Sequence, residues 1–148
     1  MIIAIDPGKS GGFAFGCHIS TVECKNMPET LGDLVDLFRQ FPQPATVYME
    51  KVGGYAGGAG APGSAMFNFG KGVGHLEAIA YTLGLEVRQV APQKWQKALS
   101  LGNSNGMTKT DWKNKLKATA QQLYPSCKVT LSTADALLIY HAAQRGLI

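Results

Sequence analysis

The sequence predicts one α/β domain over residues 1–148, with a mixed five-stranded sheet and helices on both of its faces. Three strand-like segments separated by turns open the chain, as in a β-meander. Helical and strand-like segments then alternate, and helices complete the chain. The last helical segment carries very little charge, so we expect it to pack against the sheet.

The expected strands are short runs rich in β-branched, aromatic and other apolar residues. They lie near residues 1–5, 11–17, 20–26, 45–50 and 85–90. Glycine, proline and polar residues between them indicate turns and loops.

The expected helices are identified by apolar spacing and by their end signals. They lie near residues 29–40, 64–83, 92–101, 108–124 and 133–145. Pro92 suits the first turn of a helix, and Thr108 with Asp111 forms a capping-box pattern. Arg145 and Gly146 are stop signals for the last helix.

Three carboxylates stand at the ends of these elements. Asp6 follows the first strand, Glu50 closes the fourth, and Asp135 is the lone acid in the first turn of the last helix. A carboxylate held at the end of a buried strand has the rigidity that a metal ligand or catalytic acid requires. An aspartate that only begins a turn is the simpler alternative. Two strands and one packed helix can bring these three groups to one point.

Five segments follow one another in a particular order over nearly the whole chain. They are Ile3-Ala4-Ile5-Asp6-Pro7-Gly8 with Gly11-Gly12, Val47-Tyr48-Met49-Glu50, Phe69-Gly70-Lys71-Gly72-Val73-Gly74, Val90-Ala91-Pro92-Gln93-Lys94-Trp95 and Ala134-Asp135-Ala136-Leu137. As a set they resemble the RuvC type of Holliday-junction resolvase, in the ribonuclease H-like superfamily. The short chain and its Gln-Lys-Trp element are similar to phage and prophage versions.

The resemblance implies a DNA endonuclease that resolves four-way (Holliday) junctions by metal-dependent phosphodiester hydrolysis, giving paired nicks. It makes Asp6, Glu50 and Asp135 the catalytic residues and the metal ligands. Carboxylates without cysteine or paired histidine favour Mg²⁺, with Mn²⁺ as a substitute. Two ions about 4 Å apart would activate water and stabilise the leaving oxygen, with Asp6 bridging them. No organic cofactor is expected.

The chain departs from the family pattern at Ser132, where many members carry a second Asp or a His. Ser132 therefore stands at the position of the fourth metal ligand. The spacing Ser132-x-x-Asp135 is also a capping box, in which the hydroxyl and carboxylate satisfy free amides at the helix start. We expect Ser132 to cap the helix while Asp135 points toward the metal site.

Residues expected to contact DNA lie in a basic region and in a glycine-rich loop over 52–63. Eight of the fourteen Lys and Arg residues, but one acid, fall between Arg88 and Lys128. Lysines bind phosphates and release counterions, although a Lys-rich helix is also a common solvated surface. An aromatic side chain in the loop suits stacking on an unpaired base. The expected DNA-binding residues are Tyr55, Lys94, Lys97, Lys109, Lys113 and, as a second aromatic, Phe67.

Two of these residues have a second interpretation. Lys109 stands where the family carries a catalytically important lysine, so it is expected to affect turnover as well as binding. Phe67 alternatively belongs to the core or the dimer face of the helix at 64–83.

The helix expected at 64–83 carries Gly70 and Gly74, four residues apart. Glycine costs about 1 kcal/mol in a helix interior, so the pair indicates close approach of another backbone. The resemblance implies that this helix lies at the two-fold interface of a homodimer, which places two sites on a symmetric junction. Glu77 is expected at the interface or the surface rather than among the metal ligands.

The composition agrees with a small nucleic-acid enzyme. The chain is 45% hydrophobic with a net charge of +4, and no apolar run approaches the roughly 18 residues that span a bilayer. The opening lacks the basic lead of a signal peptide, and we expect the protein in the bacterial cytoplasm, encoded by the bacterium or by a phage. Cys17, Cys24 and Cys127 lack zinc or disulfide spacing, which favours a reducing compartment. His75 and His141 are expected to be structural or surface residues.

Two other classes of function remain open. A catalytically weak or silent branched-DNA-binding module would keep the fold, and Ser132 leaves room for it. An actin-like or sugar-kinase ATP-binding lobe is the other, because Asp6-x-Gly8 and Ser10-Gly11-Gly12 resemble a first phosphate loop. Those folds need two lobes, and 148 residues supply one. Cleavage of a four-way junction with Mg²⁺, compared with linear duplex, separates the three classes.

Overall fold

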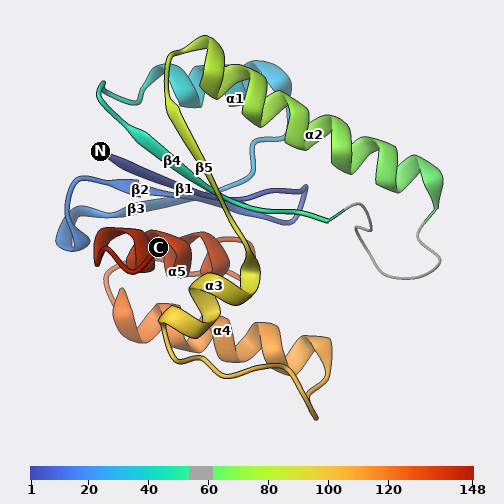
Figure 1. Ribbon diagram of the computed structural model, residues 1–148, viewed down its shortest axis with the longest axis vertical. Helices are drawn as coiled ribbons and strands as arrows, with labels where there is room; N and C mark the ends of the chain where they lie inside the picture. Colours follow the sequence, from blue (N-terminus) through green and yellow to red (C-terminus); the bar gives the residue numbers. More distant parts are fainter. Residues whose placement is uncertain (54–61) are drawn as a thin grey trace.

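The computed structural model describes residues 1–53 and 62–148 and contains a five-stranded sheet in the order β3-β2-β1-β4-β5 (Figure 1). The strands are β1 (Ile2–Asp6), β2 (Gly12–Gly16), β3 (Glu23–Asn26), β4 (Thr46–Glu50) and β5 (Glu86–Val90). The first three pair antiparallel, whereas β4 is parallel to both β1 and β5. The sheet is therefore mixed, as the sequence predicts.

The helices also occur in the expected order. They are α1 (Leu31–Arg39), α2 (Gly63–Thr82), α3 (Pro92–Ala98), α4 (Lys109–Leu123) and α5 (Ala134–Gln144). The strand expected from residue 20 starts only at residue 23, because a one-turn 3₁₀ helix occupies Ile19–Thr21. The helix expected to reach residue 101 ends at residue 98, and Ser100 just beyond it has a φ of 54°, which a helix cannot continue through.

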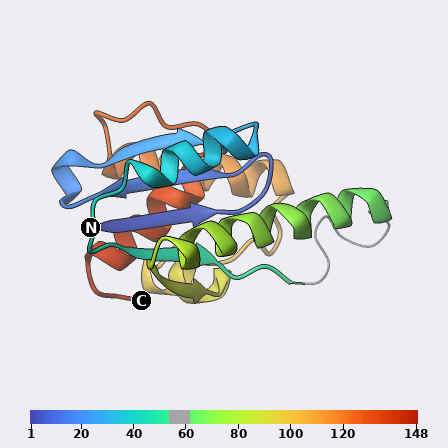
Figure 2. The same cartoon turned by 90° about the horizontal axis from the view of Figure 1, so that it is seen from above.

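Different helices cover the two faces of the sheet (Figures 1 and 2). The alternation along β1 places Ile3 and Ile5 in a core with α1 and α2, and Ala4 in a second core with α3, α4 and α5. The small side chains of Ala4 and Ala14 let α5 lie close to the sheet, where nine of its eleven residues are buried. Its lack of charge therefore reflects its packing, as expected.

Parallel pairing brings the carboxyl ends of β1, β4 and β5 to one edge of the sheet. Helix α5 begins at the same edge. A side chain added at Gly12, opposite Asp6, would meet the Ser132 backbone oxygen, whereas one added at Gly16 would meet the hydroxyl of Tyr140. The edge where β1, β4 and β5 end is therefore also the edge where the last helix starts.

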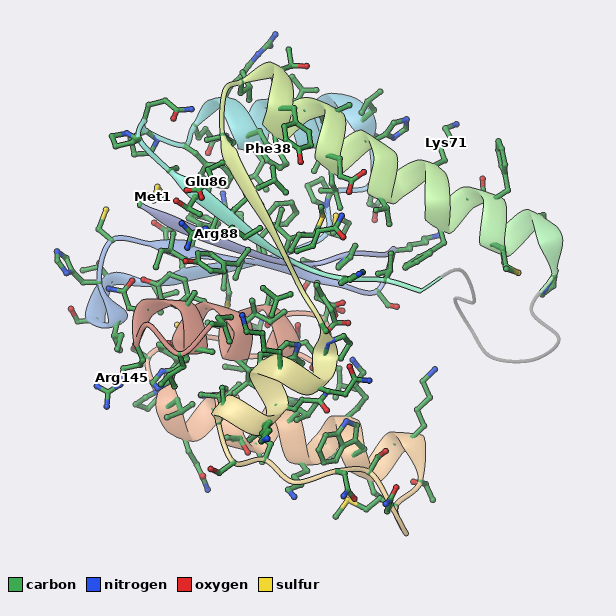
Figure 3. All side chains as sticks on the ribbon, in the orientation of Figure 1. Met1, Phe38, Lys71, Glu86, Arg88 and Arg145 are labelled. Atoms are coloured by element: carbon green, nitrogen blue, oxygen red, sulfur yellow. The ribbon has the colours of Figure 1, made fainter. Side chains whose placement is uncertain are left out.

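The first half of α2 extends beyond the sheet (Figure 1). Phe67 on this part is 70% exposed, and Figure 3 labels Lys71 on the same outer part. A Cβ added at Gly70 or Gly74 would meet no atom within 4 Å among the residues that the structure describes. The close backbone approach predicted from these glycines is therefore not made within the described chain, although the adjacent Phe69 lies against the turn at Gly8.

Several polar residues serve the fold. Glu77 accepts a hydrogen bond of 2.6 Å from Gln89 on β5, a surface contact as predicted. His141 Nδ1 lies 3.0 Å from the Tyr124 hydroxyl, which confirms a structural role.

The three cysteines are free thiols. Among the described residues, no helix has the length and apolar character that a membrane crossing needs.

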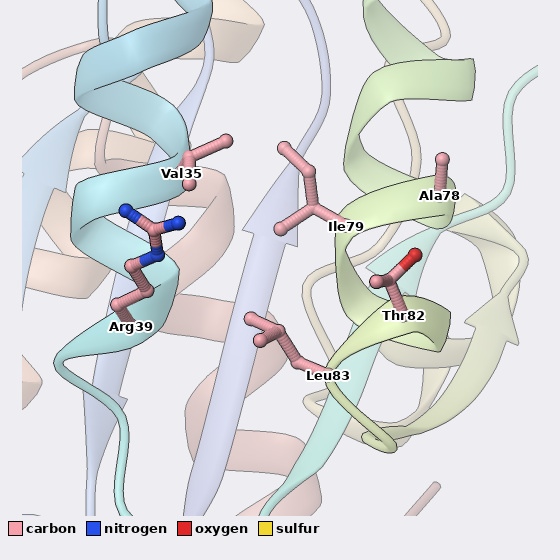
Figure 4. A pocket seen from close by; sticks show the side chains of 6 residues that line it. All are labelled: Val35, Arg39, Ala78, Ile79, Thr82 and Leu83. Atoms are coloured by element: carbon pink, nitrogen blue, oxygen red, sulfur yellow. The ribbon is translucent and has the colours of Figure 1, made fainter.

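An apolar hollow of about 230 Å³ lies between α1 and α2 (Figure 4). It is lined by Val35, Arg39, Ala78, Ile79, Thr82 and Leu83. These residues stand near the helix ends that lead into β4 and β5, so the hollow lies at the edge of the sheet opposite to Asp6 and Glu50.

Candidate active site and nucleic-acid interface

Asp6 is the last residue of β1 and is held by a tight turn. Gly8 in that turn has a φ of 118°, which side chains other than hydrogen rarely tolerate. A Cβ at Gly11 would lie 2.0 Å from the Asp6 carbonyl oxygen, so the chain folds directly back over this residue. The Pro-Gly-x-x-Gly-Gly pattern therefore fixes the backbone beneath the carboxylate.

Glu50 closes β4 and is held by its side chain as well as its backbone. It pairs in register with Val90 of β5, and the Lys51 amide donates a 2.8 Å hydrogen bond to the Val90 carbonyl. The indole Nε1 of Trp95 on α3 donates a 2.9 Å hydrogen bond to Glu50 Oε2. The carboxylate thus has a defined orientation.

Asp135 lies in the first turn of α5 and is 4% exposed. One carboxylate oxygen, Oδ2, forms an ion pair with the ammonium of Lys113 on α4. The other, Oδ1, is buried and has no hydrogen-bond partner among the described residues. An ionised carboxylate with one bare buried oxygen is costly unless another cation or donor serves it.

The three acids and Lys113 form one electrostatic cluster. Burial, reinforced by the charges of Asp135 and Glu50, raises the pKa of Asp6 to about 8. Burial also raises the pKa of Glu50, although the Trp95 hydrogen bond opposes the change. Burial alone would lower the pKa of Lys113, but attraction to Asp135, Asp6 and Glu50 outweighs it and the pKa is raised. Groups from β1, β4, α4 and α5 therefore act on one another at one edge of the sheet.

The donors in this cluster fit a hard cation. Carboxylate oxygens are the ligands that Mg²⁺ and Mn²⁺ prefer, and Asp135 Oδ1 is a buried oxygen that lacks a partner among the described residues. In residues 1–53 and 62–148, however, no three His, Cys, Asp or Glu side chains are gathered closely enough to hold a metal as they stand. The cluster therefore supplies suitable ligand oxygens, but one of them, Asp135 Oδ2, is paired with the Lys113 ammonium.

Ser132 does not cap α5, contrary to the sequence-based expectation. The N-cap residue is Thr133, and its side chain makes no capping bond. Thr133 Oγ1 instead accepts a hydrogen bond of 2.9 Å from the Thr130 amide, which ties the preceding turn together. The chain therefore enters the helix one residue later than the capping-box pattern predicts. Whether position 132 serves a metal stays a prediction.

A groove of about 860 Å³ runs from the turn after Asp6 toward α1 and α2. Ser132 lines it, together with Lys9 from the turn and Phe69 and His75 from α2. The fourth-ligand position predicted from the sequence thus opens onto a groove with a mixed polar and apolar lining.

The structure separates the lysines predicted to bind DNA. Lys94 and Lys97 on α3 and Lys109 at the start of α4 are exposed, as phosphate binding requires. Lys113, one turn beyond Lys109, lies instead in the acid cluster. Tyr55 lies outside the described residues. DNA contact by any of these side chains stays a prediction.

Solved structures similar to this chain come from Thermus thermophilus RuvC. The chain aligns with that RuvC structure at a TM-score of 0.60 and 16% identity, covering 99% of this chain and 96% of that one. It aligns with T. thermophilus RuvC in complex with a Holliday junction substrate at a TM-score of 0.62 and the same identity and coverage. The chain has the RuvC fold. No protein-family model matches the sequence, and no curated protein matches it.

Two residues of the acid cluster were not placed there from the sequence, although Lys113 was expected to bind DNA. Trp95 appeared only as part of a segment that resembles RuvC, and Lys113 only as one of several lysines. A weak signal for Lys113 exists, because the capped start of α4 and the buried Trp112 fix which face of the helix turns inward. In this chain Trp95 donates a hydrogen bond to Glu50, and Lys113 pairs with Asp135.

Proposed function

We propose that this protein is a structure-selective DNA endonuclease that cleaves four-way junctions by metal-dependent phosphodiester hydrolysis, giving paired nicks. One observation carries the proposal: Asp6, Glu50 and Asp135 come from three separate elements and share one electrostatic cluster on a RuvC fold. The similar structure solved with a Holliday junction substrate supports branched DNA as the ligand.

The three carboxylates are the residues that would hold Mg²⁺, or Mn²⁺ in its place, with two ions per site. When bound, such ions lower the pKa of water and stabilise the leaving oxygen of the phosphodiester. The turn fixes the backbone of Asp6, and Trp95 orients the carboxylate of Glu50, so the protein sets in advance where these two ligands lie. Lys113 provides a positive charge at the same point, which favours approach of a phosphate to otherwise repulsive carboxylates.

The surroundings of the cluster suit a nucleic acid. Lys94 and Lys97 on α3 and Lys109 on α4 are exposed. These two helices come next in the chain after β5, which ends at the same edge of the sheet as Asp6 and Glu50. The exposed Phe67 projects from α2 and is available for base stacking or for a second copy of the chain. A homodimer through the outer part of α2 would use the open backbone at Gly70 and Gly74 and place two sites on one junction.

We place this activity in recombination and repair of DNA in the bacterial cytoplasm, with the protein encoded by the bacterium or a phage. The test is cleavage of a synthetic four-way junction with Mg²⁺, compared with a linear duplex of the same sequence. We expect symmetric nicks in the junction alone, and their loss in Asp6→Asn. Equal cleavage of both substrates would refute structure selectivity.

A second candidate is a branched-DNA-binding module with weak or no catalysis. The pairing of Lys113 with Asp135, and the lack of a ready three-ligand group among the described residues, favour it. Tight, Mg²⁺-independent junction binding without nicks at any Mg²⁺ or Mn²⁺ concentration would select this candidate.

A further inference from the structure

Trp95 combines complete burial with one polar contact. Its side chain is 0% exposed, and its only polar atom, Nε1, donates to Glu50 Oε2 at 2.9 Å. A buried indole N–H needs an acceptor, and a carboxylate acceptor makes the bond charge-assisted and more directional. We propose that Trp95 is a positioning residue that holds Glu50 by one oxygen and leaves the other facing the acid cluster.

The path from Glu50 to Trp95 is short and rigid. Strand β5 ends at Val90, directly opposite Glu50, and Pro92 begins α3 two residues later. Proline has a fixed φ that suits this first helical position, so the direction of α3 is set where it leaves the sheet. Trp95 then follows on the first turn of α3, with its ring buried in the core that also contains Ala4 and Tyr48.

The contact with Trp95 leaves the second oxygen of Glu50 available to a ligand. Among the described residues, no hydrogen bond engages Oε1, whereas Oε2 is held by the indole. A carboxylate anchored in this way loses little conformational entropy when a ligand binds its other oxygen. That Glu50 binds a cation rests on the proposed function. That Trp95 holds Glu50 by a hydrogen bond does not depend on it.

The other tryptophan provides a matched control. Trp112 on α4 is also buried, at 9% exposed, but its ring faces the Lys115 ammonium at 5.3 Å from the ring centre. No hydrogen bond from its indole nitrogen occurs within the described part of the chain. If Trp95 only filled the core, Trp95→Phe and Trp112→Phe would affect Glu50 equally little.

Nuclear magnetic resonance tests the contact without DNA. The chain holds two tryptophans, so ¹⁵N-labelled protein has two side-chain indole signals, and Trp112→Phe assigns them. We expect Glu50→Gln to move the Trp95 indole signal and to leave that of Trp112 in place. An unmoved Trp95 signal in a folded Glu50→Gln protein would overturn the proposal.

Magnesium binding tests the use of the contact. We expect Trp95→Phe to raise the Mg²⁺ concentration for half-maximal thermal stabilisation by about tenfold or more, the usual loss for a residue that orients a metal ligand. Trp112→Phe should leave it within about twofold of wild type. If Trp95→Phe fails to fold, benzothienylalanine at position 95 keeps the ring shape and removes the N–H.

The outcomes separate the two proposals. An unchanged Mg²⁺ midpoint in the folded Trp95 variant would overturn the positioning role. Absence of any Mg²⁺ effect on the wild-type protein would overturn the proposed metal-dependent function, while the Glu50→Gln signal would still decide whether Trp95 holds Glu50.

Discussion

Replacing Asp6 with asparagine is expected to stabilise the metal-free protein and to abolish junction cleavage. Asp6 ends β1 inside the acid cluster, where burial and the charges of Asp135 and Glu50 raise its pKa from 3.8 to about 8. The unfolded chain releases this proton near pH 4, whereas the folded chain retains it until about pH 8. Folding therefore becomes less favourable as the pH rises through this window.

The structure sets the size of the effect. One retained proton changes the free energy of unfolding by about 1.4 kcal/mol per pH unit, which gives of order 5 kcal/mol across the window as an upper limit. The asparagine amide must itself be buried with imperfect partners, which costs about 1–3 kcal/mol. We therefore expect a net gain of about 2 kcal/mol at pH 8, or roughly 8 °C in melting temperature for a chain of this size.

The assay is thermal unfolding with EDTA between pH 5 and pH 8.5, compared with cleavage in Mg²⁺. The gain from Asp6→Asn should be small at pH 5 and grow toward pH 8.5, since the wild-type carboxyl is neutral at the lower pH. The exposed Asp36, which pairs with Arg39 on α1, provides the control, and Asp36→Asn should change stability by less than about 1 kcal/mol.

Two results would refute this reasoning. A stabilisation that is the same at pH 5 and pH 8.5 would show that it does not arise from the charge of Asp6. A loss of stability at pH 8 would show that the carboxylate makes a favourable contact in the metal-free protein.

Three further predictions concern the other residues of the site. Glu50→Gln and Asp135→Asn should each nearly abolish cleavage while junction affinity stays within about threefold, and full activity in either would remove that residue from the site. Lys113→Ala should lower the free energy of unfolding at pH 7 by about 1–2 kcal/mol, because it leaves the buried Asp135 without its cation while Lys113 itself is partly solvated. Lys109→Ala, the exposed control on the same helix, should change the free energy of unfolding by under about 0.5 kcal/mol. It should instead reduce the slope of log affinity for DNA against log salt concentration by about one unit. A loss of stability in Lys109→Ala with none in Lys113→Ala would refute the separate roles of the two lysines. Ser132→Asp should keep its melting temperature, because Ser132 makes no cap, and should reach half-maximal activity at lower Mg²⁺; an unchanged or higher metal requirement would show that position 132 does not face the metal.

Much of the fold could be predicted because its signals are local. Apolar alternation and helical spacing depend on neighbouring residues, so they identified β1, β4 and α5 and placed Asp6, Glu50 and Asp135 at their ends. The errors were local as well. A turn at 19–21 shortened one strand, and the N-cap is Thr133 rather than Ser132, because the Thr133 side chain and amide bond to Thr130 in the turn before the helix.

The partners of the carboxylates could not be predicted in this way. Trp95 is 45 residues from Glu50, and Lys113 is 22 residues from Asp135. Their meeting depends on how α3 and α4 pack over one face of the sheet. A pattern within a helix indicates at most which face turns inward, not which residue of another element that face meets. The raised pKa of Asp6 has the same origin, since it comes from burial and from charges on other elements.

The sequence by itself determined that Asp6 and Glu50 end strands and that Asp135 lies in the first turn of the last helix, because apolar periodicity and turn chemistry act over a few neighbouring residues. Only the tertiary structure decided that Trp95 holds Glu50 and that Lys113, rather than Lys109, neutralises Asp135. Those contacts join residues far apart in the chain, and their geometry is set by the packing of whole helices against the sheet.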